Sequence, residues 1–140
     1  MKLTHFQTLT EEAATAASVE SLIDKTLFFV ALFHIYHWQT KSYAEHTALG
    51  KFYEGLQEKV DELAELYMQN DRVLEPKLDF EVTKYSKDTA RKQLEEYKAE
   101  LTSVESKLMG DEKSSYHAAA DIMVDLQAEC DKLLYLLTLE

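Results

Sequence analysis

The chain has little of what ends or interrupts helices. Its 140 residues include three glycines and a single proline, Pro76. Strands joined by tight turns need more of both residues, so their scarcity favours long helices. The length suits one domain with one sizeable core. We therefore expect an all-α protein that forms a single domain over residues 1–140.

Disulfides and membrane spans are also missing from the sequence. Cys130 is the only cysteine, so no intrachain disulfide can form, and a reducing cytoplasm is the expected compartment. We expect its thiol to fill space in the core. The longest apolar run, residues 27–38, is too short to cross a bilayer. The first residues lack the apolar stretch of a signal peptide. We therefore expect a cytoplasmic protein with no membrane contact.

Positive charge is scarce. Lys and Arg number 15 against 26 Asp and Glu, so the formal net charge is −11. Nucleic acids and anionic membranes are bound largely through Lys and Arg, so this balance argues against direct binding to DNA. An acidic surface instead attracts cations.

Two periodic stretches predict two helices in the first half of the chain. The first is expected to be capped at Thr10 or Ser18 and to end near Gln39, so that residues 1–17 form an N-terminal segment. The second begins after Ser42, with a glutamate three residues later that completes a capping box. The expected core positions are Leu22, Ile23, Thr26, Leu27, Val30, Phe33, His34 and His37 in the first helix, and Leu49, Phe52, Tyr53, Leu56, Val60, Leu63, Ala64 and Tyr67 in the second.

The second half of the chain predicts a crossover and two further helices. Residues 70–86 lose periodicity and form the crossover. A heptad pattern then continues to Gly110, and the last helix starts near Ser114 or Ser115. Two antiparallel hairpins joined by a long crossover form a ferritin-like four-helix bundle. The expected core positions are Ala90, Leu94, Tyr97, Leu101, Val104 and Leu108, then Ala119, Ile122, Met123, Leu126, Cys130, Leu133 and Leu137.

The first helix is apolar on more than one face. Phe28, Leu32 and Ile35 lie opposite its predicted core stripe. A helix that is apolar all round is buried all round. Either a second subunit covers this face, or the crossover or the N-terminal segment does.

Histidines and carboxylates form a candidate metal-ligand set. His37 and His46 lie where the first helix ends and the second begins, and Asp61 follows His46 by fifteen residues. Imidazole and carboxylate ligands suit iron, manganese or zinc. Asp61 and Glu65 belong to an acidic band on the outer face of the second helix, which also contains Glu54, Glu58 and Glu62.

One chain cannot bring these ligands together. At 1.5 Å per residue, His46 and Asp61 are ~22 Å apart along the second helix. Two copies of this helix packed antiparallel about a two-fold axis would place His46 of one chain against Asp61 and Glu65 of the other. His37 would join His46 from the same chain.

The motifs in residues 19–69 resemble those of Dps-like mini-ferritins. The shared features are a His-Trp pair ending the first helix (His37-Trp38), a histidine opening the second (His46) and the segment Asp61-Glu62-Leu63-Ala64-Glu65. The resemblance implies a ferritin-like fold with a di-iron site between two subunits.

In that family the histidine pair and the carboxylate pair come from different subunits. The resemblance implies His37 and His46 as metal ligands from one chain, with Asp61 and Glu65 from its partner. It implies oxidation of Fe(II) by peroxide or oxygen, that is, a ferroxidase, for iron storage or protection against oxidative stress. It also implies a homo-oligomer, from a two-fold dimer to a dodecamer.

One departure from the family leaves a second function open. The family has an acidic residue four positions after the second histidine, where this chain has Gly50. Glu45 is a candidate substitute, although its position favours helix capping. A chain that kept the bundle but lost the chemistry would be a helical oligomeric scaffold or interaction protein.

Two further histidines have simpler interpretations. His34 lies one turn before His37, and we interpret it as a hydrogen-bonded core histidine rather than a further ligand. His117 has Asp121 four residues later, a spacing that can bind a metal but in an exposed pair usually does not.

Overall fold

The computed structural model describes residues 5–69, 71–111 and 114–139, with side chains except for those of residues 5–12, 114 and 115. The described residues form helices and no strand, and the all-α fold is consistent with a four-helix bundle. The helices are α1 (His5–Gln39), α2 (Tyr43–Met68), α3 (Lys87–Met109) and α4 (Ser114–Leu136).

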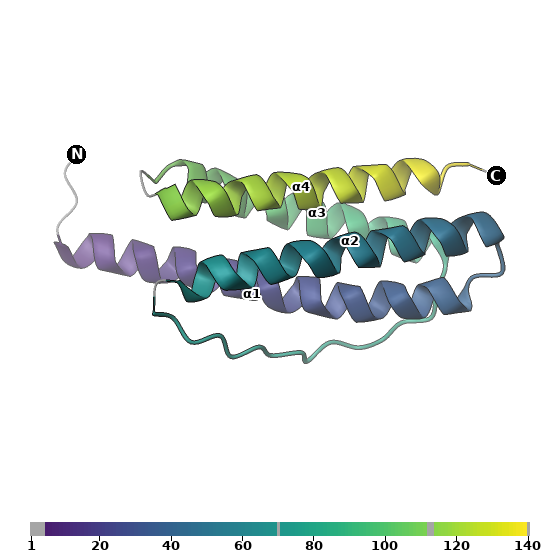
Figure 1. The fold of residues 1–140 in the computed structure, drawn as a ribbon, viewed down its shortest axis with the longest axis horizontal. Helices are drawn as coiled ribbons and strands as arrows, with labels where there is room; N and C mark the ends of the chain where they lie inside the picture. The colour runs from purple at the N-terminus through teal and green to yellow at the C-terminus, as the bar shows by residue number, and fades with distance from the viewer. Residues whose placement is uncertain (1–4, 70, 112–113, 140) are drawn as a thin grey trace.

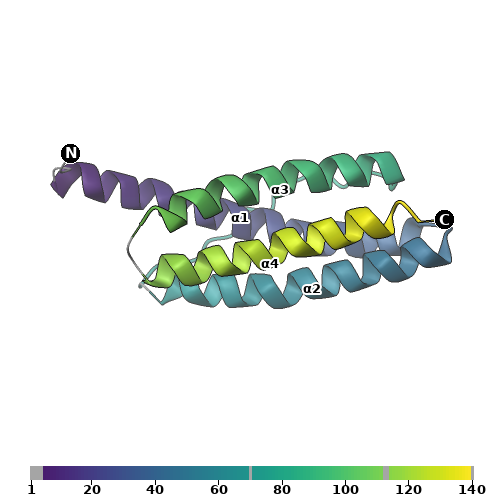
Figure 2. The same ribbon diagram turned by 90° about the horizontal axis from the view of Figure 1, so that it is seen from above.

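The helices pack in pairs. α1 lies along α2, α3 lies along α4, and α2 also packs against α4 (Figures 1 and 2). A turn of three residues separates α1 from α2. Residues 71–86 form no helix or strand and run along the bundle beside α1 (Figure 1). We call residues 69–86 the crossover.

The start of α1 differs from the prediction. α1 begins at His5, so residues 5–17 are helical rather than an N-terminal segment. Ser18 does not cap the helix, because its hydroxyl donates to the carbonyl of Ala14 at 3.1 Å, a bond within the helix. The side chain of Thr10 lies outside the described residues. The stretch EEAATAA has strong helix formers but no apolar stripe, so its helix was not visible as periodicity.

The core positions predicted for α3 and α4 are buried, and those of α2 are buried except for half-buried Tyr53 and Ala64. The stripe predicted for α1 is partly wrong: Leu32 is fully buried, whereas Leu27 is half-buried. An all-apolar helix has no unique stripe, so packing decides its orientation. The buried positions of α1 are Val19, Leu22, Ile23, Thr26, Phe29, Leu32, Phe33 and Tyr36.

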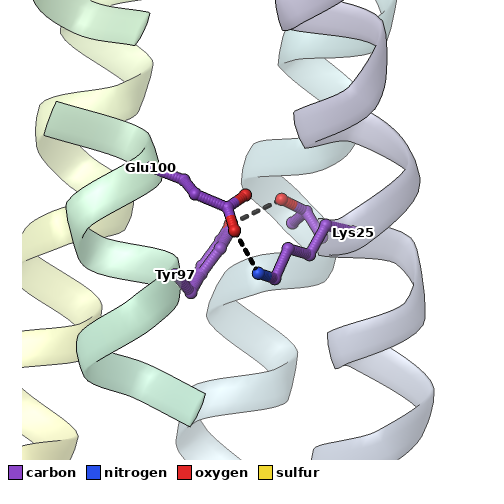
Figure 3. A network of polar contacts seen from close by, with 4 residues as sticks. Lys25, Tyr97 and Glu100 are labelled. Carbon is purple, nitrogen blue, oxygen red and sulfur yellow. Dashed lines mark hydrogen bonds and ion pairs between the residues drawn. The ribbon is translucent and has the colours of Figure 1, made fainter. Parts of the chain in front are cut away.

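Two polar contacts join α1 to α3 (Figure 3). The hydroxyls of Thr26 and Tyr97 are 2.5 Å apart in the core, and Lys25 Nζ lies 2.5 Å from Glu100 Oε1 at the surface. Burial raises the pKa of Tyr97 well above its usual range. The buried pair therefore satisfies two polar groups that water does not reach.

The crossover covers one part of the second apolar face of α1. Phe80 stacks on Phe28 with ring centroids 4.7 Å apart. The Tyr36 hydroxyl lies 2.5 Å from Thr83 Oγ1, also on the crossover. For Phe28 the crossover, which was the alternative to a second subunit, therefore provides the cover, and Leu32 of the same predicted face is buried in the core.

The crossover leaves a neighbouring stripe of α1 partly exposed. Leu27, Ala31, His34 and Trp38 follow one another along the helix, and each is half-buried or exposed. Trp38 is 65% exposed. Within the described residues, no helix has the length and apolar character that a membrane span requires.

Candidate metal centre

The histidines on either side of the α1–α2 turn hold each other by reciprocal hydrogen bonds. His37 Nδ1 lies 2.5 Å from the carbonyl oxygen of His46, and His46 Nδ1 lies 2.7 Å from the carbonyl oxygen of His37. The two rings stack with centroids 3.6 Å apart and planes tilted by 17°. The short turn, with Ser42 as the N-cap of α2, brings the last turn of α1 beside the first turn of α2.

These bonds fix the tautomer of both rings. A carbonyl oxygen only accepts, so each Nδ1 carries the hydrogen and donates it. The Nε2 atom of each neutral ring then keeps its lone pair. Histidines that bind metals have this arrangement, in which the second nitrogen donates to a carbonyl or carboxylate. In the neutral form of each half-buried ring, Nε2 is therefore the nitrogen that can accept a metal ion.

The stack also limits how an ion can bind. The Nε2 lone pair lies in the plane of its ring, and bonds from imidazole to a metal are about 2.1 Å long. Planes tilted by 17° meet far from either ring, so one ion cannot lie in both planes. The observed pair suits two ions, one on each ring.

The lack of a side chain at Gly50 makes room for the His37 ring. A Cβ atom at Gly50 would lie 3.1 Å from both Cε1 and Nδ1 of His37, closer than ordinary packing allows. The residue is buried on the face of α2 that carries His46. A carboxylate at this position would have to displace the His37 ring, so the glycine and the histidine pair belong together.

The Glu45 carboxylate binds a residue of the crossover. The Tyr85 hydroxyl, on the crossover, donates to the Glu45 carboxylate. The predicted capping box is only half formed: the Ser42 hydroxyl accepts from the Glu45 amide at 3.3 Å, but the Ser42 amide donates to Thr40 Oγ1. Burial raises the pKa of Tyr85 well above its usual range, and the hydrogen bond to Glu45 is the second cause of this rise. Glu45 therefore anchors the crossover.

His34 is not the hydrogen-bonded core histidine that the sequence suggested. It is half-buried, and its ring lies between those of Tyr53, at 4.2 Å, and Trp38, at 4.3 Å. The Tyr53 ring also meets that of His37 edge-on at 5.6 Å. The rings of Trp38 and His34 on α1 and of Tyr53 on α2 therefore pack beside the histidine pair.

The two carboxylates lie on the outer face of the same helix, as predicted. Asp61 and Glu65 are exposed, and neither forms an ion pair or hydrogen bond with the described residues. The helical rise places Asp61 ~22 Å from His46. Within the described residues, no three His, Cys, Asp or Glu side chains gather closely enough to hold an ion.

A groove lies beside Asp61, between α1 and α2. Its volume is about 700 Å³. Apolar side chains line it from both helices and from the crossover, and carboxylates form its rim. The apolar residues are Ile23, Leu27, Val60, Ala64 and Leu74, and the charged ones are Glu54, Glu58, Asp61 and Glu62.

The remaining histidine considered from the sequence has a structural contact. His117 Nε2 lies 2.6 Å from the carbonyl oxygen of Asp111, to which it donates across the α3–α4 turn. Asp121 is exposed, and Asp125 pairs with Lys59 at 3.3 Å. His117 and Asp125 therefore connect parts of the bundle to one another.

Sequence reasoning missed the crossover residues that support the site. Tyr85 bonds to Glu45 through its hydroxyl and to Gln39 Oε1 through its amide at 2.8 Å. It thereby connects the crossover to both helices next to the histidine pair. An aromatic residue just before the Ser86 cap was the only signal, and it is a weak one.

Comparison with known proteins assigns a family without a known activity. Neither the curated proteins nor the solved structures gave a match. The family match spans residues 37–137, from His37 through α2, α3 and α4, and includes His46, Asp61 and Glu65. The chain belongs to a family of unknown function, DUF5856.

Proposed function

We propose that this protein is a Dps-like, ferritin-type bundle of two antiparallel hairpins that oxidises Fe(II) at a site shared by two chains. One chain would supply His37 and His46, and its partner Asp61 and Glu65. The observation that carries the proposal is the reciprocal pair of histidine bonds, which leaves both Nε2 atoms as ligands.

The donor set suits two Fe(II) ions as substrate. Neutral imidazoles and carboxylates both bind first-row divalent ions, and negative carboxylates stabilise the ferric product more than the ferrous substrate. Each Fe(II) gives one electron to hydrogen peroxide, the O–O bond breaks, and two protons complete two water molecules. Asp61 and Glu65 carry no competing partner among the described residues, so ligation would break no ion pair there.

The two-fold arrangement follows from the separation of the ligands. His37 and His46 lie on either side of the α1–α2 turn, whereas Asp61 and Glu65 lie near the other end of α2. An antiparallel second copy brings each pair against the other and creates two equivalent sites. We therefore propose a homo-oligomer with at least this dimer, and a dodecamer as the largest assembly.

A scaffold function is the second candidate, and the Gly50 contact favours it. The His37 ring lies 3.1 Å from where a Cβ at position 50 would stand, which leaves little room for the acidic ligand of mini-ferritins, and Glu45 is bound to Tyr85 instead of replacing that ligand. With fewer carboxylates the site would hold ferric ions less strongly. The bundle would then serve only as an interaction module.

Anaerobic titration of Fe(II) separates the two candidates. We expect about two Fe(II) ions per chain, followed by a rapid rise in ferric absorbance when peroxide is added. The double variant His46→Ala/Asp61→Ala should lose both signals. The matched control His117→Ala/Asp121→Ala removes the same residue types from α4 and should keep both. Binding no stronger than that of the double variant would support the scaffold.

A further inference from the structure

Trp38 is an exposed aromatic side chain, and the α1–α2 groove is a largely apolar hollow at a different place along the same helix. Trp38 is 65% exposed near the end of α1, whereas the groove of about 700 Å³ has an apolar floor and lies near Leu27 and Ala64. Eleven residues, about three helical turns, separate Leu27 from Trp38 on one stripe of α1. Within a single chain the indole therefore cannot fill the groove.

The packing of α1 on α2 fixes where a two-fold axis would cross this face. Phe33 packs on Phe52 at 4.8 Å and His34 on Tyr53 at 4.2 Å, so residues 33–34 of α1 lie level with residues 52–53 of α2. An axis that pairs His46 with Asp61 crosses α2 midway between them, at residues 53–54. It therefore crosses α1 near residue 33.

Rotation about this axis places the exposed rings over the groove. Trp38 lies about five residues beyond the axis on α1, so it meets the partner chain about five residues before the axis, next to Leu27. Tyr43, which is 84% exposed, meets the partner near Ala64 by the same rotation on α2. Both Leu27 and Ala64 line the groove.

We infer that Trp38 of one chain occupies the α1–α2 groove of a second copy of this chain, and that this contact fixes the two-fold arrangement. The inference rests on the shared site proposed above and names the contact that aligns its two halves. The indole ring covers the apolar floor, and the acidic rim offers acceptors for its N–H group. The His34 ring already packs against the indole with ring centroids 4.3 Å apart, so part of the side-chain freedom of Trp38 is lost before binding.

The contact can be followed directly because Trp38 is the only tryptophan. We would record its emission and its quenching by acrylamide during dilution, with the mass measured in parallel, both without metal and with Zn²⁺, which is not oxidised. The dimer should show blue-shifted emission and slow quenching, and dilution to the monomer should reverse both. Trp38→Ala should raise the dissociation constant of the dimer by about 30-fold or more.

A groove-filling variant gives the matched test. Ala64→Leu fills the groove without touching Trp38, and should weaken the dimer and expose the indole of the partner. Ala128→Leu makes the same change on the exposed face of α4 and should leave both readings as in wild type.

The outcomes separate this inference from the proposed function. A dimer that binds Fe(II) but keeps a water-exposed indole would overturn the Trp38 contact and leave the shared site intact. A dimer with a buried indole that Ala64→Leu disrupts would support the contact even if no Fe(II) binds, and would overturn only the proposed oxidation. A chain that stays monomeric at every concentration, with and without Zn²⁺, would overturn both.

Discussion

The core between α1 and α3 and the outer face of α1 and α2 differ in whether one chain completes them. In the core, Thr26 and Tyr97 satisfy each other's hydroxyls. On the outer face, the Nε2 atoms of His37 and His46 are left as ligands, Asp61 has no partner among the described residues, and the Trp38 ring is exposed. The core therefore stabilises one chain, whereas the outer face presents groups that a second chain and ions would complete under the proposed function.

Substitution in the core should have the largest effect on folding. Leu101 on α3 is fully buried, so Leu101→Ala should lower the free energy of unfolding by about 2–5 kcal/mol through lost burial and a residual cavity. Urea denaturation measures the change. The neighbouring exposed Ser103→Ala should stay within about 0.5 kcal/mol of wild type. Equal losses in both variants would contradict the division between core and surface.

Substitutions at the buried hydroxyl pair should show that the two groups satisfy each other within one chain. Tyr97→Phe leaves the Thr26 hydroxyl without its partner and should cost about 1–2 kcal/mol of unfolding free energy. Adding Thr26→Val removes the second polar group. The double variant should therefore lose less unfolding free energy than the sum of the losses in the two single variants. Tyr135→Phe, at a 62% exposed position, is the control. A strictly additive double variant would show that the two hydroxyls are not coupled.

Alkaline pH should weaken the core through its ionisable groups. Burial raises the pKa of the Cys130 thiol from 9.0 to about 12. Below pH 9 the thiol is protonated in both states, whereas between pH 9 and 12 it ionises mainly in the unfolded state. The free energy of unfolding should therefore fall in this window, by at most about 1.4 kcal/mol per pH unit for this group.

The raised pKa values of Tyr67, Tyr85 and Tyr97 add to the slope above pH 9 in both chains, so the contribution of the thiol is the difference in slope between wild type and Cys130→Ala. Cys130→Ala should have a shallower slope than wild type in urea titrations, whatever its stability at neutral pH. An unchanged slope would mean that the thiol ionises equally in the folded and unfolded chain.

Changes at the carboxylates should hardly affect the folded chain. Asp61→Asn/Glu65→Gln removes two like charges spaced i,i+4 on an exposed helix face, so the free energy of unfolding without metal should rise by no more than about 0.5 kcal/mol. Fe(II) binding should be lost in the same variant. A large loss of stability would show that these carboxylates serve the core.

Sequence reasoning succeeded where a helix has one apolar stripe. The heptad positions of α3, from Ala90 to Leu108, are buried as predicted because only one orientation hides them. In α1 the apolar residues surround the helix, and aromatic packing such as Phe33 on Phe52 chose an orientation that periodicity could not choose.

The candidate site was predictable only in part. The proximity of His37 and His46 follows from the short turn, but their tautomers follow from backbone carbonyls that no residue pattern reveals. The Tyr85–Glu45 bond joins positions forty residues apart through a crossover without periodicity. The proposed link from the histidines to Asp61 would lie between chains, and one sequence gives only the separation of these residues along the helix.

Mixing two inactive variants tests the shared site most directly. His37→Ala/His46→Ala lacks both histidines, and Asp61→Ala/Glu65→Ala lacks both carboxylates, so neither homodimer has a complete site. After unfolding and refolding together, about half of the dimers are mixed, and one of the two sites in each mixed dimer is intact. We therefore predict recovery of about a quarter of the wild-type Fe(II) sites and of the peroxide-driven oxidation. No recovery in mixed dimers, demonstrated by mass, would contradict a site built from two chains.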